Sequence, residues 1–275
     1  MPAPQGSMLA NLTKLQFTAQ GNTLPMDWQD QGDQYDQGFD PSELTVAPNP
    51  PDCLFQAATL NKYHVDTAKD AGDKLATYID GICDAICSGI GNWMSSCAVA
   101  GVIINGPVGV MVPGNLTGPP LAGFILPSAP MATAQEIAYS NAIANAFGTA
   151  WLSWSSLLMG QLPYPAFAAV PSPVAPPAPN VPMPLIAFSS GGEVQLSASM
   201  LKMAMDANFG DPTALHASNL FDALSKAFAQ VFITFKSSTM IQNVMGTGPV
   251  PVFAPPFVPV GPVVGGVGNG AAVLV

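Results

Sequence analysis

The sequence predicts a mainly α-helical protein with extended Pro/Gly-rich arms and short β-ribbons, and two observations lead to this fold class. The first is an internal repeat, in which residues 79–113 align without a gap with residues 221–255. The second is the spacing of apolar residues inside the repeat, which follows one helix face and then gives way to prolines and glycines. Repeated units bury their apolar faces against one another. We therefore expect two clear helix-plus-arm repeats and one weaker one, with pseudo-three-fold packing as one arrangement open to them.

The helical part of the repeat places apolar side chains where one face of a helix requires them. A weaker middle copy shows the same spacing, although any amphipathic helix would show it too. A serine pair follows each copy, where small hydroxyl groups can satisfy the last helical carbonyls or allow close helix approach. The residues expected to pack or interact are Ile82, Ile86, Ile90, Trp93, Ser95 and Ser96 in the first copy, Ile143, Phe147, Trp151 and Trp154 in the middle copy, and Leu224, Phe228, Phe232, Phe235, Ser237 and Ser238 in the third.

Composition shifts along the chain divide it into four segments. They are an irregular acidic N-terminal arm over 1–63, a first module of helix plus arm over 64–130, a second module with a Pro-rich arm over 131–192, and a short helix with the third module over 193–275.

Each element has a local signal. A first helix is expected from about Val65 to Ala98, and a second from a capping-box pattern at Thr133 and Glu136 to about Met159. A short helix is expected over Ser199–Asn208. The last should run from the pair Asp211 and Pro212, an N-cap followed by a proline, to about Met245. Alternating apolar residues at 102–104 and 108–112 predict two short strands or an extended ribbon interrupted by Pro and Gly. The proline run at 172–184 predicts a polyproline-like extension or a plain linker, and an extended apolar tail follows the third module.

Charged residues are scarce and unevenly placed. They make up 9% of the chain, the formal net charge is −10, and the basic residues are seven lysines with no arginine. Nucleic acid and anionic membranes as partners are disfavoured, because both draw on clustered basic residues. The stretches 85–135, 137–192 and 237–275 contain no charge at all. Uncharged apolar surface promotes association, so we expect assembly into something larger; the alternative is a secreted protein kept soluble by its net charge.

A membrane span is considered for Ala85–Ile104, an uncharged stretch of sufficient length. Its repeat partner contains Lys226 and Lys236, and prolines interrupt the uncharged C-terminal run, so membrane insertion is disfavoured. The N-terminus has no basic start followed by a long apolar core, and no secretory signal is predicted.

No metal or cofactor site is predicted. The four cysteines lack a CxxC pair or a neighbouring histidine, and buried free thiols are the expectation for Cys53, Cys83, Cys87 and Cys97. The aspartates between Asp27 and Asp40 recur at a spacing that a calcium loop does not use.

No catalytic residue is predicted either, and we expect a protein that is not an enzyme. The serine pairs lie far along their helices from the histidines, His64 and His216. Asp80 and Asp222 occupy equivalent repeat positions, and an acid/base dyad across a pseudo-symmetry axis is one hypothesis for them. The simpler interpretation is that each is a solvated helix-face carboxylate or binds a neighbouring helix terminus.

The function expected from these features is that of a structural subunit of a large assembly. Long Pro/Gly-rich arms, few charges and no predicted catalytic residue fit a virion component assembled in the cytoplasm, such as a phage tail, baseplate or capsid-cementing protein. Its partners would be itself or other structural proteins of the same assembly. Arms bearing Phe253 and Phe257 would reach neighbouring subunits. The alternative is a secreted or surface-exposed adhesion protein, for which the glycosylation sequons at Asn11 and Asn115 are weak support. A membrane-inserting protein ranks third.

Overall fold

The computed structural model describes residues 3–21, 57–165, 167, 174–214, 216–250, 253–254, 258–259 and 262–275. The chain forms two compact units, one made of Met1–Phe17 with Asp80–Val275 and the other of Thr18–Ile79. Helix α5 (Ala57–Ser96) contributes to both units. In the smaller unit, Lys74 and Asp70 form an ion pair one helical turn apart. The acidic segment predicted around Asp27 to Asp40 lies outside the described residues.

The larger unit contains an eight-stranded antiparallel sheet, so the chain has a mixed α/β fold and the prediction of a mainly α protein with short ribbons is wrong. The strand order is β5-β9-β12-β1-β2-β4-β7, and β3 pairs with β1. The strands are β1 (Ala98–Asn105), β2 (Val108–Met111), β3 (Leu116–Thr117), β4 (Leu158–Pro163), β5 (Val174–Pro179), β7 (Ser189–Ser190), β9 (Met245–Pro249) and β12 (Val264–Ala271). The physical reason is that the segments expected to reach out as separate arms pair with one another and satisfy their backbone groups within the chain.

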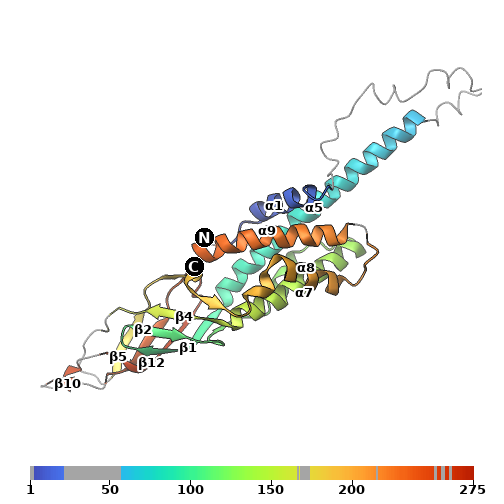
Figure 1. Cartoon of the computed structure of the whole chain (residues 1–275). Helices are drawn as coiled ribbons and strands as arrows, with labels where there is room; N and C mark the ends of the chain where they lie inside the picture. The colour runs from blue at the N-terminus through green and yellow to red at the C-terminus, as the bar shows by residue number, and fades with distance from the viewer. Residues whose placement is uncertain are drawn as a thin grey trace, which may run out of the picture. The chain divides into compact units, whose positions relative to one another are not determined.

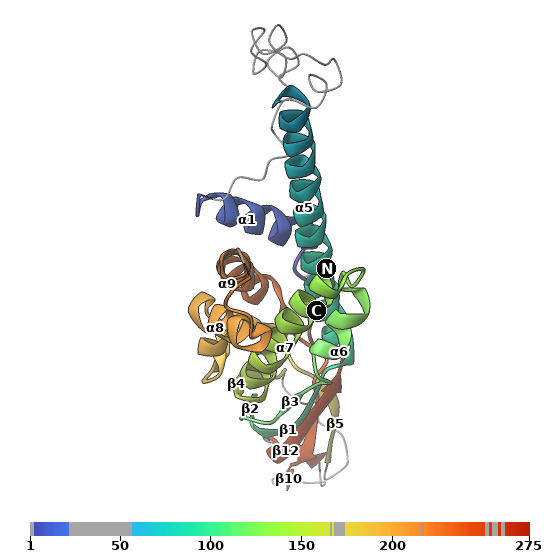
Figure 2. The same ribbon diagram turned by 90° about the vertical axis from the view of Figure 1, so that its right-hand side faces the viewer.

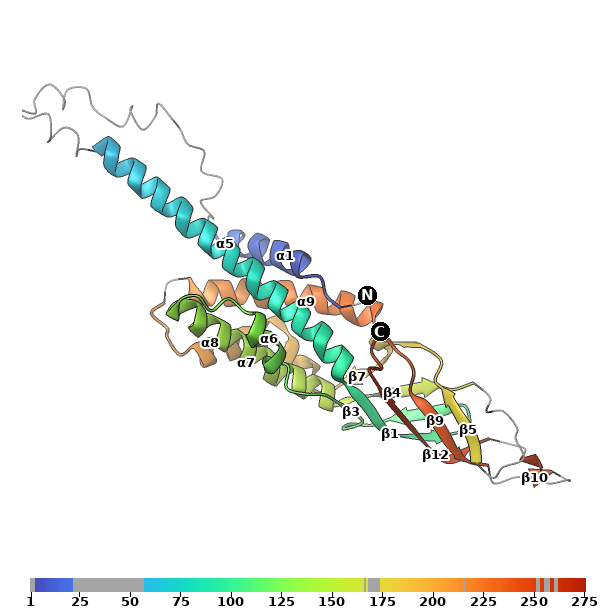
Figure 3. The same cartoon turned by 180° about the vertical axis from the view of Figure 1, so that it is seen from behind.

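Two further two-stranded ladders accompany the main sheet. They pair β6 (Met183–Pro184) with β8 (Met240–Ile241) and β10 (Phe253–Ala254) with β11 (Val258–Pro259). Figure 1 and Figure 3 show the main sheet continuing beyond the C-terminal ends of the helices that lead into it.

The helices of the larger unit pack side by side (Figure 2). Besides the last part of α5 they are α1 (Gly6–Thr18), α6 (Ala122–Ile125), α7 (Ala134–Ser156), α8 (Ala198–Phe209) and α9 (Ala217–Ser238), with short 3₁₀ turns η2 (Leu126–Ser128), η3 (Leu185–Ala187) and η4 (Glu193–Leu196). Helix α8 contacts both α7 and α9. Phe147 of α7 meets Phe228 of α9 at a centroid distance of 4.7 Å, so these two helices also touch directly.

The repeated sequence builds a helix that passes almost directly into a strand. Helices α5, α7 and α9 end at Ser96, Ser156 and Ser238, and strands β1, β4 and β8 begin two positions later. In the sheet, β2 separates β4 from β1, and β12 separates β1 from β9, all by antiparallel pairing. Strands β4, β1 and β9 therefore run in the same direction. Strands β4 and β1 come directly after α7 and α5, and β9 follows α9 after the short strand β8.

Several predicted elements are confirmed. The strands at 102–104 and 108–112 form the β1–β2 hairpin, and α8 covers the short helix expected at Ser199–Asn208. Helix α7 starts with the capping box, because the Thr133 side chain accepts from the Glu136 backbone and the Glu136 carboxylate accepts from the Thr133 backbone N–H.

Other predicted elements are wrong, each for a physical reason. The N-terminal arm contains α1, whose Leu9 and Phe17 are buried. The proline run contains β5, which prolines can form because it is an edge strand. The third repeated helix begins at Ala217 instead of Asp211, since Asp211 accepts two hydrogen bonds from Thr213 in a turn.

Candidate interaction surface

The repeated apolar residues lie in the core of the chain itself. All twelve helical positions named from the sequence are buried: Ile82, Ile86, Ile90, Trp93, Ile143, Phe147, Trp151, Trp154, Leu224, Phe228, Phe232 and Phe235. Trp151 is at the centre of an aromatic cluster, with Trp93 at a centroid distance of 5.4 Å and Phe235 at 5.8 Å. These side chains hold the helices of the three copies together, and a partner cannot reach them in the folded chain.

The serine pairs end the helices. Ser96 donates to the Asn92 carbonyl, Ser156 to that of Ser153 and Ser238 to that of Phe235. Each hydroxyl therefore satisfies a carbonyl of the final helical turn, one of the roles expected for it.

The two repeat-equivalent carboxylates do not form a dyad. Asp80 pairs with Lys14 of α1, and Asp222 pairs with Lys226 one turn further along α9, both at 2.7 Å. Each carboxylate has its own lysine, as surface carboxylates often do.

Three cysteines are buried and free: Cys83, Cys87 and Cys97. Burial raises the pKa of Cys87 to about 12 and that of Cys97 to about 11. Such thiols stay protonated and are poor metal ligands or nucleophiles. Within the part of the chain that the structure describes, no cluster of three or more His, Cys, Asp or Glu side chains could hold a metal ion. Cys53, Phe257 and the Phe253 side chain lie outside the described residues.

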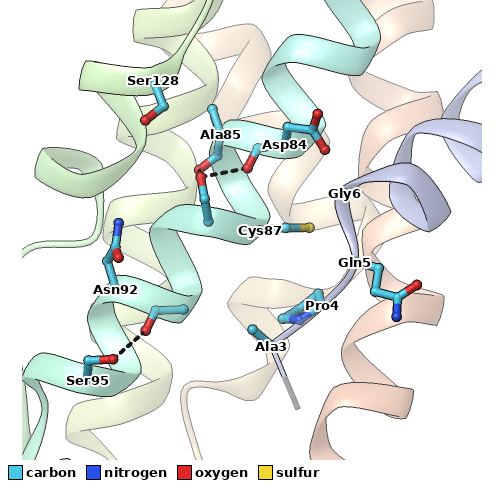
Figure 4. A pocket seen from close by; sticks show the side chains of 12 residues that line it. Ala3, Pro4, Gln5, Gly6, Asp84, Ala85, Cys87, Asn92, Ser95 and Ser128 are labelled. Atoms are coloured by element: carbon cyan, nitrogen blue, oxygen red, sulfur yellow. Dashed lines mark hydrogen bonds between the residues drawn. The ribbon is translucent and has the colours of Figure 1, made fainter. Parts of the chain in front are cut away.

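A groove of about 630 Å³ lies between the N-terminal segment Ala3–Gly6 and the last turns of α5 (Figure 4). Asp84 is the charged side chain in its lining. Ser88 donates to the Asp84 carbonyl and Ser95 to that of Gly91, so both hydroxyls serve their own helix. The groove offers one carboxylate and small neutral groups, a chemistry too sparse to define a ligand.

The outer face of the sheet is an exposed apolar surface without charge. We use this name for Ile103, Val110, Val112, Met159, Val264 and Val267, which are all exposed. Val110 pairs with Ile103, and Ile103 with Val267, in the strand register. Directly paired residues share a face, so these three side chains form a continuous row across β2, β1 and β12. Their neighbours Val102 and Ile104 point the other way and are buried.

The same row ends in polar but uncharged residues. Val110 pairs with Gln161 of β4 on one side, and Val267 pairs with Thr247 of β9 on the other. This one row therefore has an apolar centre and two neutral polar ends, while Met159 of β4 and Met245 of β9 add exposed apolar side chains next to those ends. An apolar centre with a polar rim is common in interfaces between proteins.

Asparagines fix two bulges beside this row. The Asn269 side-chain oxygen accepts from the Gly101 backbone N–H, and that of Asn105 accepts from the Gly265 N–H, each at 2.9 Å. Both glycines have positive φ, of 75° and 67°. Only glycine adopts this conformation readily, so the bulges are set by the sequence and fix the register of β1 against β12.

None of the described strands contains a charged residue. In the larger unit the charges lie on helices, on the η4 turn and on Asp211 just before α9. Sequence reasoning detected the uncharged stretches but did not find the outer face, because it treated the strands as separate arms. The sequence has no signal that marks this face, because the residues on both faces of β1 are apolar, as Val102, Ile103 and Ile104 are.

The described helices include none that combines the length and the apolar character needed to cross a bilayer. The stretch considered as a span, Ala85–Ile104, is divided between α5, which ends at Ser96, and strand β1. No protein-family model, curated protein or solved structure matches this chain.

Proposed function

We propose that this chain is a structural subunit of a larger protein assembly and that it assembles through its uncharged sheet. The observation that supports the proposal most directly is the combination of an exposed apolar row with strands that contain no charge. Contiguous exposed apolar surface is disfavoured on a free protein, because water contact with it costs free energy and association removes that contact.

The type of contact differs from the one expected from the sequence. Segments expected to reach neighbouring subunits as arms are strands of the chain's own sheet, so they present a surface instead of inserting into a neighbour. We favour a virion as the assembly, such as a phage tail, baseplate or capsid-cementing layer, and a non-enzymatic role within it. The low charge content and the repeated packing module support this choice.

The secreted or surface-exposed alternative loses one of its supports. Asn115, the acceptor of a predicted sequon, is buried; its oxygen accepts from the Val112 N–H and its amide donates to the Ala100 carbonyl. A glycan on the Asn115 amide nitrogen would have to displace the residues that bury this side chain.

The experiment is sedimentation velocity and negative-stain imaging of the full chain, alone and in fractions from its natural source. We expect discrete particles that contain the chain. A chain that stays monomeric alone and sediments with no other protein in its natural source would contradict the proposal.

A further inference from the structure

We propose that the outer face of the sheet is the contact with a second copy of this chain, stacked face to face. This inference rests on the proposed function and identifies the partner at its surface. The contact is the same patch on both copies, as in a two-fold symmetric dimer.

Charge is the first reason to place the contact between two copies at this face. Two copies each have a net charge of −10 and repel one another over most of their surface. The strands contain no charge, so the sheet is where two copies can approach with the least repulsion. A basic partner or a nucleic acid would gain nothing at this face, because it offers no group of opposite charge.

The geometry of the row is the second reason. Val110, Ile103 and Val267 lie side by side in register, and Ile103 and Val267 keep 49% and 45% of their surface exposed. Branched aliphatic side chains on one sheet interdigitate with those of another at a spacing of about 10 Å. A two-fold axis through the middle of the row would place apolar side chains of one copy on those of the other. The neutral polar ends would then face neutral polar ends.

The sheet edges favour stacking over strand addition. Edge strand β5 includes Pro176, Pro177 and Pro179, which have no N–H to donate. The opposite edge strand, β7, consists of Ser189 and Ser190 alone. A neighbouring strand would find little to pair with at either edge, whereas the face remains open.

The size of the face predicts a reversible contact. Six strands about 4.8 Å apart, each with about five residues in the sheet, cover about 500 Å² per copy. Permanent interfaces bury about 800 Å² or more on each partner. We therefore expect an association that depends on protein concentration.

The first test compares two double variants by sedimentation velocity over a concentration series. Ile103→Lys with Val267→Lys places two charges in the row on each copy, and we expect the dissociation constant to rise at least about 10-fold. The control is Ile233→Lys with Met203→Lys, which changes two apolar residues on α9 and α8 that are more exposed than those of the row. The control should associate like the original chain.

Circular dichroism and urea unfolding verify that all variants fold. If the lysine pair unfolds the sheet, Ile103→Thr with Val267→Thr replaces it, because threonine is compatible with a strand and still removes apolar surface. Equal weakening by the face and control variants would overturn the inference, and so would no weakening by the face variants.

The second test is cross-linking in a Cys53→Ser background, in which the described cysteines are buried. A single Ile103→Cys should form a covalent dimer with a short bismaleimide, and Ile233→Cys should not. Dimers from both positions would indicate random collision and overturn the inference. If Ile103→Cys gives no dimer while the chain still sediments in a larger particle, the inference fails and the proposed function stands; a monomer throughout contradicts both.

Discussion

At the scale of single residues, Tyr164 packs against the buried face of the sheet. Its ring lies against backbone from three strands, at Gly109 of β2, Gly246 of β9 and Gly268 of β12. A Cβ at any of these glycines would come within 2.7 Å of the tyrosine. Glycine is needed at these positions because of space, since none of the three has a positive φ.

The Tyr164 hydroxyl is buried, and none of the residues that the structure describes forms a hydrogen bond with it. We expect Tyr164→Phe to keep or raise the free energy of unfolding, by up to about 1 kcal/mol, because it removes an unsatisfied polar group. Tyr164→Ala should lower the same free energy by about 3 kcal/mol or more, because it leaves a cavity. Urea unfolding measures both changes. A marked loss in Tyr164→Phe would mean that the hydroxyl does have a partner.

Alkaline pH should destabilise the protein, because the buried Tyr164 hydroxyl and cysteine thiols lose their protons. Burial raises the pKa of Tyr164 from 10.0 to about 12 and that of Cys97 from 9.0 to about 11. A raised pKa favours the protonated group in the folded state, so this stabilisation is complete below the unfolded pKa and is lost as the pH rises through the folded value. Thermal unfolding should show a flat midpoint up to pH 9 and a fall between pH 9 and 12. In Tyr164→Phe the fall should be smaller, and an equal fall would exclude Tyr164 as a contributor.

At the scale of elements, the helix starts and helix ends have different signals. Thr133 caps α7 with its side chain, whereas Ser197 precedes α8 without a side-chain capping hydrogen bond. At the other end, each repeated helix stops at the second serine of its pair. The start of α7 thus depends on the Thr133 side chain, whereas each repeated helix ends at a serine pair and the next strand begins two residues later.

This difference predicts unequal effects of two similar substitutions. Thr133→Ala should lower the free energy of unfolding by about 1 kcal/mol, since the first-turn N–H groups lose their acceptor. Ser197→Ala is the matched control and should change it by a few tenths at most, because its hydroxyl caps nothing. Chemical denaturation measures both, and equal losses would show that intrinsic preference, and not the hydrogen bond, governs these helix starts.

The sequence predicted the elements with local signals and missed those that depend on distant partners. The α7 capping box and the β1–β2 hairpin are encoded by residues close together. The residues of strand β12 were predicted only as part of an extended apolar tail. Their glycines give little strand preference, and their pairing partners lie far away in the chain. The outer face was missed for the same reason, since it exists only once β2, β1 and β12 lie together.

At the scale of the whole molecule, charge and apolar surface are segregated. In the described part of the larger unit the charges are absent from the strands, and the exposed apolar row crosses the sheet. This separation connects the low charge content of the sequence with a specific place in the fold.

Salt should therefore not weaken self-association. If copies meet through neutral surfaces, added salt screens only the repulsion between acidic regions, and the dissociation constant should stay constant or fall. Sedimentation at low and high sodium chloride concentration measures this dependence. An association that weakens as salt is added would point to ion pairs and away from the sheet.

Strand β12 has a consequence for synthesis, because it lies between β9 and β1 in the middle of the sheet. The Gly101 N–H cannot donate its hydrogen bond to Asn269 until that residue, 168 positions further along the chain, has been synthesised. At about 5–20 residues per second, a ribosome needs on the order of 10 s to cover that distance. During this interval Val102 and Ile104 have no completed sheet to cover them. The nascent chain is thus most prone to aggregation before residues 264–271 emerge, and a chaperone would be of most use to it then.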